Sequence, residues 1–187
     1  MIDNEIIYDE AKIILHERGL HGVLEKYGRV HVVGSYTLRL MTWRDLDIFV
    51  ESEEKGSQQM FKLGQEAHQA VNGYKSFLTD YSHGEPEFGF SGYYWGIRTR
   101  DVGNEWWKID IHVEGNVRCM KQLEAQRTIE SKLNDGNRAI ILAIKEQAAS
   151  WPEYRKSITS IDIYNAVLDH GVLNITGFKQ YLGMAKA

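Results

Sequence analysis

The sequence predicts an α/β protein, in which a small mixed β-sheet is backed by helices and followed by a helical C-terminal region. Short β-branched runs alternate with amphipathic stretches through the first part of the chain. Two of the strand-like segments place polar residues on one face and apolar residues on the other, which is typical of half-buried strands. After this part the pattern is helical only. We therefore expect an α/β domain over residues 1–115 and a helical region over residues 116–187.

The N-terminal segments predict a helix and then a strand that ends in a tight turn. Apolar residues recur near helical spacing over residues 3–27, with charged residues between them. The β-branched run over residues 29–33 predicts a buried strand that ends at Gly34-Ser35. A short helix is expected over residues 36–41.

The middle of the chain predicts four more strands and one helix. A strand is expected over residues 45–50, and an amphipathic helix over residues 56–72. Further strands are expected over residues 74–80, 88–98 and 106–113, the last of which alternates clearly between polar and apolar side chains. These segments complete the predicted α/β domain.

The C-terminal region is expected to contain helices alone. A helical pattern runs from about residue 118 to 150, and Trp151-Pro152 marks a break, because proline disfavours the helical conformation at the preceding residue. Two last helices are expected over residues 159–170 and 175–183. The sequence of this region indicates no ligand.

Composition and charge exclude several classes of protein. Of 187 residues, 43% are hydrophobic and 26% are charged, which is typical of a globular protein. The single cysteine, Cys119, excludes a disulfide within the chain and a cysteine-rich zinc site. The absence of a signal-peptide pattern and of a long apolar run predicts a cytoplasmic protein without a membrane partner. A net charge of −4 makes nucleic acid an unexpected partner, and the oligomeric state stays open.

Three aspartates are the candidate metal ligands. Asp45 and Asp47 lie two residues apart in a predicted strand, so their carboxylates share one face. Asp110 shares a face of a later strand with Lys108 and His112. If the two strands are neighbours, three carboxylates converge, and their repulsion requires a cation. Oxygen ligands favour Mg²⁺ or Mn²⁺, and two such ions about 4 Å apart can clamp the attacking and leaving oxygens of a phosphoryl-type transfer.

The Gly34-Ser35 turn is the second candidate feature. Glycine allows a sharp turn and a close approach of the backbone to a ligand. The helix expected after this turn would offer free backbone amides, which favour an anion. A strand, this turn and the acids of the next strand would together place a triphosphate beside the metal ions.

These motifs resemble the signature of the polymerase-beta nucleotidyltransferase superfamily. Val33-Gly34-Ser35 is followed, after nine residues, by Asp45-Leu46-Asp47-Ile48, and Lys108-Ile109-Asp110-Ile111 resembles the third acidic strand of that superfamily. The resemblance covers roughly residues 28–113. It implies a catalytic domain that transfers a nucleoside monophosphate from a nucleoside triphosphate to a hydroxyl and releases pyrophosphate. It also implies roles by position: Gly34 and Ser35 contact the triphosphate, Asp45 and Asp47 bind both metal ions, and Asp110 completes one metal site and helps activate the hydroxyl.

The residues around the motif indicate which kind of member the chain resembles. Arg44 lies directly before the first acid, and a charged residue at this position resembles the small-molecule transferases of the antibiotic-modifying kind. The segment after the turn, Tyr36-Thr37-Leu38-Arg39, differs from that of the minimal antitoxin-like members. A small-molecule acceptor is therefore expected. A protein-modifying transferase and a non-catalytic nucleotide-binding module are the alternatives.

Four further residues are candidates for ligand contact near the acids. Arg44 and Lys108 are candidate nucleotide-binding residues, although each could also be an ordinary surface charge. Tyr94 and Trp106 are the aromatic residues expected to line a pocket beside the acids.

Overall fold

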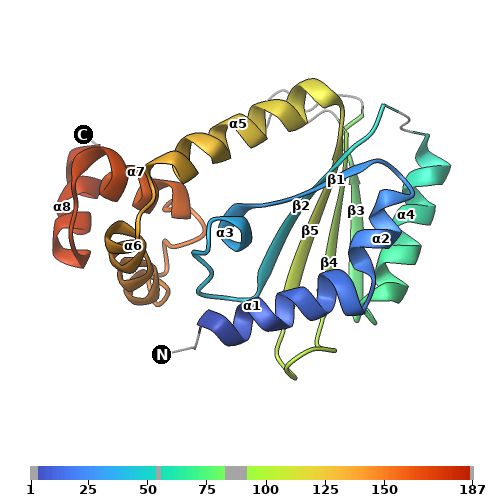
Figure 1. Cartoon of the computed structure of the whole chain (residues 1–187), viewed down its shortest axis with the longest axis horizontal. Coiled ribbons are helices and arrows are strands. Elements are labelled where there is room, and N and C mark those ends of the chain that lie inside the picture. Colours follow the sequence, from blue (N-terminus) through green and yellow to red (C-terminus); the bar gives the residue numbers. More distant parts are fainter. Residues whose placement is uncertain (1–3, 54–55, 83–91, 186–187) are drawn as a thin grey trace. The chain divides into compact units, whose positions relative to one another are not determined.

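A mixed β-sheet forms the framework of the N-terminal part of the chain (Figure 1). The computed structural model describes residues 4–53, 56–82 and 92–185. Within them the sheet has five strands in the order β1-β2-β5-β4-β3; β2 and β5 are parallel, and the other neighbouring pairs are antiparallel. The strands are β1 (Arg29–Val33), β2 (Asp45–Glu51), β3 (Lys75–Asp80), β4 (Tyr93–Thr99) and β5 (Trp107–Glu114).

The five strands agree with the sequence prediction. Each lies within two residues of its expected bounds, except that the N-terminal end of the segment predicted over residues 88–98 lies partly outside the described residues. The mixed sheet backed by helices confirms the predicted fold class. The chain divides into two compact units, an N-terminal unit over Asp3–Glu124 and a C-terminal unit over Ala125–Ala187.

The first predicted helix is divided in the structure. It consists of α1 (Asn4–Lys12), a π-helical turn (Ile13–Glu17) and α2 (Leu20–Glu25). Gly19 lies between them in the left-handed conformation, at φ 76°, which a residue without a Cβ adopts at little cost. This glycine ends one helix and allows the next to start in a new direction.

The other two helices of the N-terminal unit lie at the expected segments, although the first of them ends four residues earlier than predicted. The short helix α3 (Gly34–Thr37) begins directly at the predicted turn, two residues earlier than expected. The amphipathic segment forms α4 (Ser57–Ala70), whose buried side includes Met60, Leu63 and Ala67.

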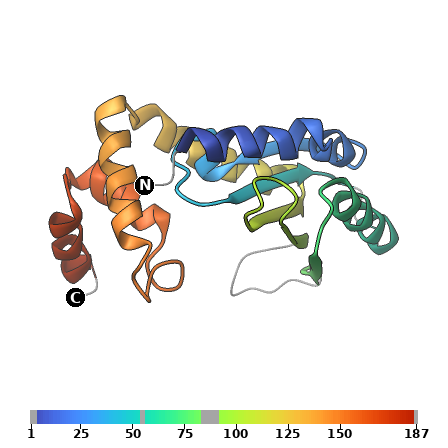
Figure 2. The ribbon, with the colours of Figure 1, turned by 90° about the horizontal axis from the view of Figure 1, so that it is seen from below.

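The two faces of the sheet have different roles. Helices α1, α2 and α4 cover the apolar face; α1, in blue, crosses the strands in Figure 1 and lies in a layer beside the sheet in Figure 2. The core between these layers contains strand residues from β2 and β5 together with helix residues, including Leu46, Ile48, Val50, Ile109, Ile111, Ile7, Ile14, Leu24, Met60 and Leu63. Alternation along the strands leaves the polar residues on the opposite face.

The start of helix α5 (Asn116–Lys132) covers one end of that polar face. Cys119 is fully buried there against Val33 and Phe49, and Leu123 packs on the same cluster. The cysteine is therefore a small core residue with no access to solvent.

The C-terminal unit contains the rest of α5, α6 (Asp135–Ala148), α7 (Ser160–His170) and α8 (Ile175–Ala185). The continuous helical pattern over residues 118–150 is broken at Asn134, which was not expected. Asn134 and Asn137 exchange side-chain to backbone hydrogen bonds of 2.8 and 3.0 Å and so form a capping box that starts α6. Among the described residues, no helix combines the length and the apolar character that crossing a membrane requires.

Candidate active site

The three predicted aspartates meet on the polar face of the sheet. In the parallel register of β2 and β5, Asp47 lies opposite Asp110, and Asp45 lies opposite Lys108. One carboxylate oxygen from each of Asp45, Asp47 and Asp110 lies within 4.8 Å of the other two. The strands that carry the acids are therefore neighbours, and the alternation within each strand directs the side chains to one place.

The Gly34 turn forms one wall of this site. Strand β1 is antiparallel to β2, and its last residue, Val33, lies opposite Asp47. Gly34 follows in the left-handed conformation, at φ 69°. A Cβ at this position would lie 2.7 Å from the Oδ2 atom of Asp47, which is closer than van der Waals contact. Only glycine fits both the backbone conformation and the space beside the carboxylate.

Lys108 lies between two of the acids. Its Nζ atom is 2.5 Å from Oδ2 of Asp110 and 3.2 Å from Oδ1 of Asp45. Burial lowers the pKa of Lys108, but the attraction of the two carboxylates outweighs this and raises the pKa overall. The ammonium group stays protonated and neutralises part of the acidic charge.

The acids also perturb one another. Burial raises the pKa of Asp45 above its ordinary value, the neighbouring Asp110 raises it further, and Lys108 opposes both effects. Arg98 adds a more distant positive charge, with its Nη1 atom 3.9 Å from Oδ1 of Asp110. The site thus concentrates negative charge that its own cations balance only in part.

Tyr94 holds the third acid in position. Its hydroxyl donates a hydrogen bond of 3.0 Å to Oδ1 of Asp110. Burial raises the pKa of Tyr94, and the charge of Asp110 raises it further. The phenol therefore remains a hydrogen-bond donor at any physiological pH, which confirms its expected place beside the acids.

His112 lies on the same face but is embedded among aromatic rings. Its ring is 5.0 Å from the rings of both Phe49 and Tyr94. Burial lowers the pKa of His112 to about 4. The imidazole is neutral at pH 7 and a weak proton acceptor, so a role as general base is not supported.

The low pKa of His112 predicts a pH-dependent stability for the metal-free protein. The unfolded chain binds a proton near pH 6.5, whereas the folded protein binds it only near pH 4. The stabilisation that comes from keeping His112 neutral is therefore complete above pH 6.5. As the pH falls toward 4, the free energy of unfolding decreases by about 3 kcal/mol in total. Urea unfolding in EDTA at several pH values measures this change.

The matched control for this measurement is His112→Phe, which keeps an aromatic ring between Phe49 and Tyr94. This variant should lose the His112 part of the pH dependence between 4 and 6.5. A titration midpoint of His112 near 6.5, observed by NMR in the folded protein, would contradict the expectation.

Two candidate residues are not brought to the acids. The guanidinium group of Arg44 forms two hydrogen bonds with Glu10, of 2.5 and 2.9 Å, and the indole of Trp107 donates to the same carboxylate at 3.1 Å. Arg44 thus connects the residue before β2 to α1 by a largely buried ion pair. Trp106 is 49% exposed and packs on the ring of Tyr74 instead. A strand begins only at Trp107, so the alternation on which the expectation for Trp106 rested does not extend to it.

Three site features were not predicted from the sequence. Arg98 lies opposite Lys108 in the antiparallel register of β4 and β5, and Gly96 lies opposite Asp110. The ring of Phe77 lies over Gly96, where a Cβ would come within 2.4 Å of it. The alternation in β4 could have indicated that Arg98 shares a face with Tyr94. The position of Phe77 depends on the pairing of β3 with β4, which no local pattern fixes.

Comparison with known proteins shows similarity in structure and not in sequence. The sequence matches no protein-family model, and no curated protein matches it. A cytoplasmic RNA terminal U-transferase is similar over 86% of this chain and 46% of its own, with a TM-score of 0.53 and 15% identity. Terminal uridylyl transferase 4 from Trypanosoma brucei, with bound UPU, is similar over 89% of this chain and 54% of its own, with a TM-score of 0.56 and 11% identity.

The chain thus spans about half the length of these two solved structures. At such low identity, the similarity concerns the fold. It agrees with the five-stranded mixed sheet and its supporting helices. The chain therefore has the nucleotidyltransferase fold, with three clustered aspartates on the polar face of its sheet.

Proposed function

We propose that this chain is a divalent-metal-dependent nucleotidyltransferase, which moves a nucleoside monophosphate from a nucleoside triphosphate to a hydroxyl. The observation that carries the proposal is the cluster of Asp45, Asp47 and Asp110, whose carboxylate oxygens lie within 4.8 Å of one another. Such a cluster is unfavourable without a cation, and it occurs here in a nucleotidyltransferase fold.

The donor set suits Mg²⁺ or Mn²⁺. All three side chains offer carboxylate oxygens, which are the ligands that these hard ions prefer. Asp45 and Asp47 would hold both ions, and Asp110 would complete one site. Bound ions would neutralise charge on the phosphates and polarise the phosphorus–oxygen bonds.

The remaining residues would position the substrates. Gly34 and Ser35 would contact the triphosphate, because the missing Cβ lets the turn lie directly against Asp47, one of the proposed metal ligands. Lys108, released from the acids when cations neutralise them, would bind a phosphate oxygen. Asp110, held by Tyr94, would orient the acceptor hydroxyl and accept its proton. The acceptor oxygen then bonds to the α-phosphorus as the bond to the leaving pyrophosphate breaks.

For the acceptor, the terminal ribose hydroxyl of RNA is our first candidate. Its support is the structural similarity to an RNA terminal U-transferase and to a terminal uridylyl transferase with bound UPU. The aromatic ring of Phe77, 40% exposed beside Gly96, also offers a surface on which a base could stack.

A small-molecule hydroxyl is the second candidate. The net charge of −4 favours it, because nonspecific binding of nucleic acid usually accompanies a positive charge. Arg44, whose position before the first acid also favoured a small molecule, binds Glu10 in the structure and gives this candidate no further support.

Thermal unfolding with each of the four nucleoside triphosphates, with and without Mg²⁺, tests donor binding. Ligands that bind only the folded state raise the melting temperature. We expect a Mg²⁺-dependent rise that disappears in the Asp45→Asn, Asp47→Asn double variant. An equal rise in that variant would reject the proposed site.

Incorporation of an α-labelled triphosphate then identifies the acceptor. The protein is incubated with a short single-stranded RNA, with an aminoglycoside, or with a cell lysate. Label on the RNA 3′ end supports the first candidate, and label on the aminoglycoside supports the second. Label on a polypeptide would indicate a protein-modifying transferase. Binding without transfer to any of these acceptors would indicate a non-catalytic nucleotide-binding module.

A further inference from the structure

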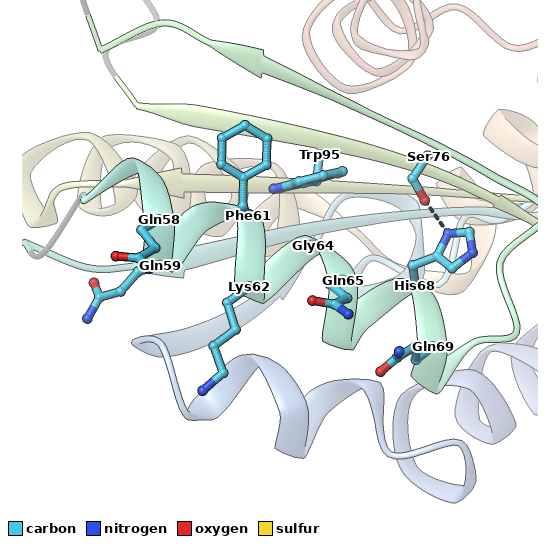
Figure 3. A pocket seen from close by; sticks show the side chains of 10 residues that line it. All are labelled: Gln58, Gln59, Phe61, Lys62, Gly64, Gln65, His68, Gln69, Ser76 and Trp95. Carbon is cyan, nitrogen blue, oxygen red and sulfur yellow. Dashed lines mark hydrogen bonds between the residues drawn. The ribbon is translucent and has the colours of Figure 1, made fainter.

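A pocket lies on the other side of the sheet from the three aspartates. It has a volume of about 830 Å³ and lies between α4 and the edge strand β3 (Figure 3). Ser76 pairs in register with Ile97 and Trp95 with Ile111, which are core residues of the apolar face. The pocket is therefore separate from the acids. It is lined by Gln58, Gln59, Phe61, Lys62, Gly64, Gln65, His68, Gln69, Ser76 and Trp95.

One face of α4 provides most of the lining. Gln58, Phe61, Gln65 and His68 recur at intervals of three and four residues, so they share one side of the helix. Phe61 is 59% exposed, so a face of its ring is open to a ligand. Figure 3 shows Gln58 and Phe61 at one end of the pocket and His68 at the other.

The inner wall of the pocket is fixed by close packing. A Cβ at Gly64 would lie 2.1 Å from the indole of Trp95, so the ring rests directly on the backbone of α4. The indole nitrogen of Trp95 donates a hydrogen bond of 2.9 Å to the carbonyl oxygen of Met60. At the far end, Nδ1 of His68 lies 2.5 Å from Oγ of Ser76. The pocket is thus largely formed before any ligand binds.

Its chemistry combines an exposed aromatic face with several carboxamides. Within the described residues, the side chains of Gln58, Gln65 and Gln69 are exposed to solvent, and none of the described lining residues is acidic. A carboxamide both donates and accepts hydrogen bonds. Lys62 adds a positive charge at the rim, where its Nζ atom is 3.9 Å from Oε1 of Glu66.

We propose that this pocket binds a nucleobase and its attached phosphate. A base would stack on Phe61, and the glutamine carboxamides would pair with the donors and acceptors on its edge. Lys62 would bind the phosphate. The volume lies within the range typical of small-ligand sites. This site does not depend on the proposed catalytic function. The base could belong to a free nucleotide or to one residue of an RNA strand.

The test uses the full chain in EDTA, so that a metal-dependent site at the aspartates does not contribute. Binding of each of the four nucleoside 5′-monophosphates is followed by NMR through the glutamine side-chain amides. Binding of a fluorescently labelled single-stranded RNA trinucleotide is followed by fluorescence anisotropy. We expect binding in at least one arm, with shifts in the amide signals of Gln65 and its neighbours on α4.

Two variants locate the binding. Phe61→Ala and Gln65→Ala change exposed side chains and should leave the fold intact. Phe61→Ala should weaken binding about tenfold, because stacking of one base on an aromatic ring contributes on that scale. Trp106→Ala is the matched control, because Trp106 is another exposed aromatic side chain, which packs on Tyr74, lies outside the lining of this pocket and is not brought to the three aspartates.

The outcomes decide both the site and the source of the base. Equal affinity for monophosphates and the trinucleotide would assign a free nucleotide, and much tighter binding of the trinucleotide would assign an RNA strand. No binding in either arm would overturn the proposal, as would equal binding by the wild-type protein and both α4 variants. Neither result would bear on the metal-dependent triphosphate binding expected at the aspartates.

Discussion

Replacing Asp47 with asparagine is expected to lower nucleotidyl transfer by about a thousandfold or more, since it removes a proposed ligand of both metal ions. Asp47 connects two parts of the site: it lies opposite Asp110 in register, and its Oδ2 atom lies against Gly34. Asparagine has nearly the same shape but carries one amide nitrogen in place of a carboxylate oxygen. It has no negative charge with which to hold a divalent ion.

The same substitution should not unfold the protein. The three carboxylates lie close enough to repel one another in the metal-free protein. Removing one of the charges should leave the metal-free melting temperature unchanged or increase it. Loss of activity together with an unchanged or higher melting temperature would separate a catalytic effect from a structural one.

Glu51→Gln is the matched control for this prediction. Glu51 lies on the same strand and the same face as Asp47, but its carboxylate accepts hydrogen bonds from His31 and Asn116 at the other end of β2. This variant should retain transfer and Mg²⁺-dependent triphosphate binding. If Asp47→Asn kept more than about a tenth of the wild-type rate with saturating Mg²⁺, the assigned metal site would be wrong.

The shared face of the three aspartates could be predicted from the sequence, because it depends on the alternation of side chains within each strand. Alternation in a strand places Asp45 and Asp47 on one face, and the apolar residues between them determine which face is buried. The same rule applies to Asp110 in β5. Only the adjacency of the two strands had to be supplied by the resemblance, and the parallel register of β2 and β5 confirms it.

Features that depend on distant partners could not be predicted in this way. Arg44 is adjacent to Asp45 in the sequence, yet its position is determined by Glu10, 34 residues earlier on α1. The exposed face of α4 looks like an ordinary polar helix surface until β3 is placed beside it. The start of α6 was missed for a different reason, because it depends on a capping box at Asn134, a local signal that the surrounding helical pattern conceals.

The second large effect is expected at Gly34, which supports Asp47 without being a ligand. Gly34→Ala should reduce nucleotidyl transfer by about a hundredfold, because a displacement of a catalytic group by about 1 Å can have an effect of this size. The added Cβ would lie 2.7 Å from Oδ2 of Asp47, so either the turn or the carboxylate must move. The variant should also lose about 1–2 kcal/mol of stability, because alanine is unfavourable in the left-handed conformation.

Gly19→Ala separates these two effects. Gly19 has nearly the same backbone conformation, at φ 76°, but no atom lies within 4 Å of the position that its Cβ would take. Both variants should therefore lose similar stability in urea unfolding, whereas only Gly34→Ala should lose the Mg²⁺-dependent rise in melting temperature with a triphosphate. If both variants kept that rise, the space beside Asp47 would not matter for binding, and the Gly34 turn would serve only the fold. If both lost it, backbone strain alone would account for the effect, and the close contact between Gly34 and Asp47 would have no separate role.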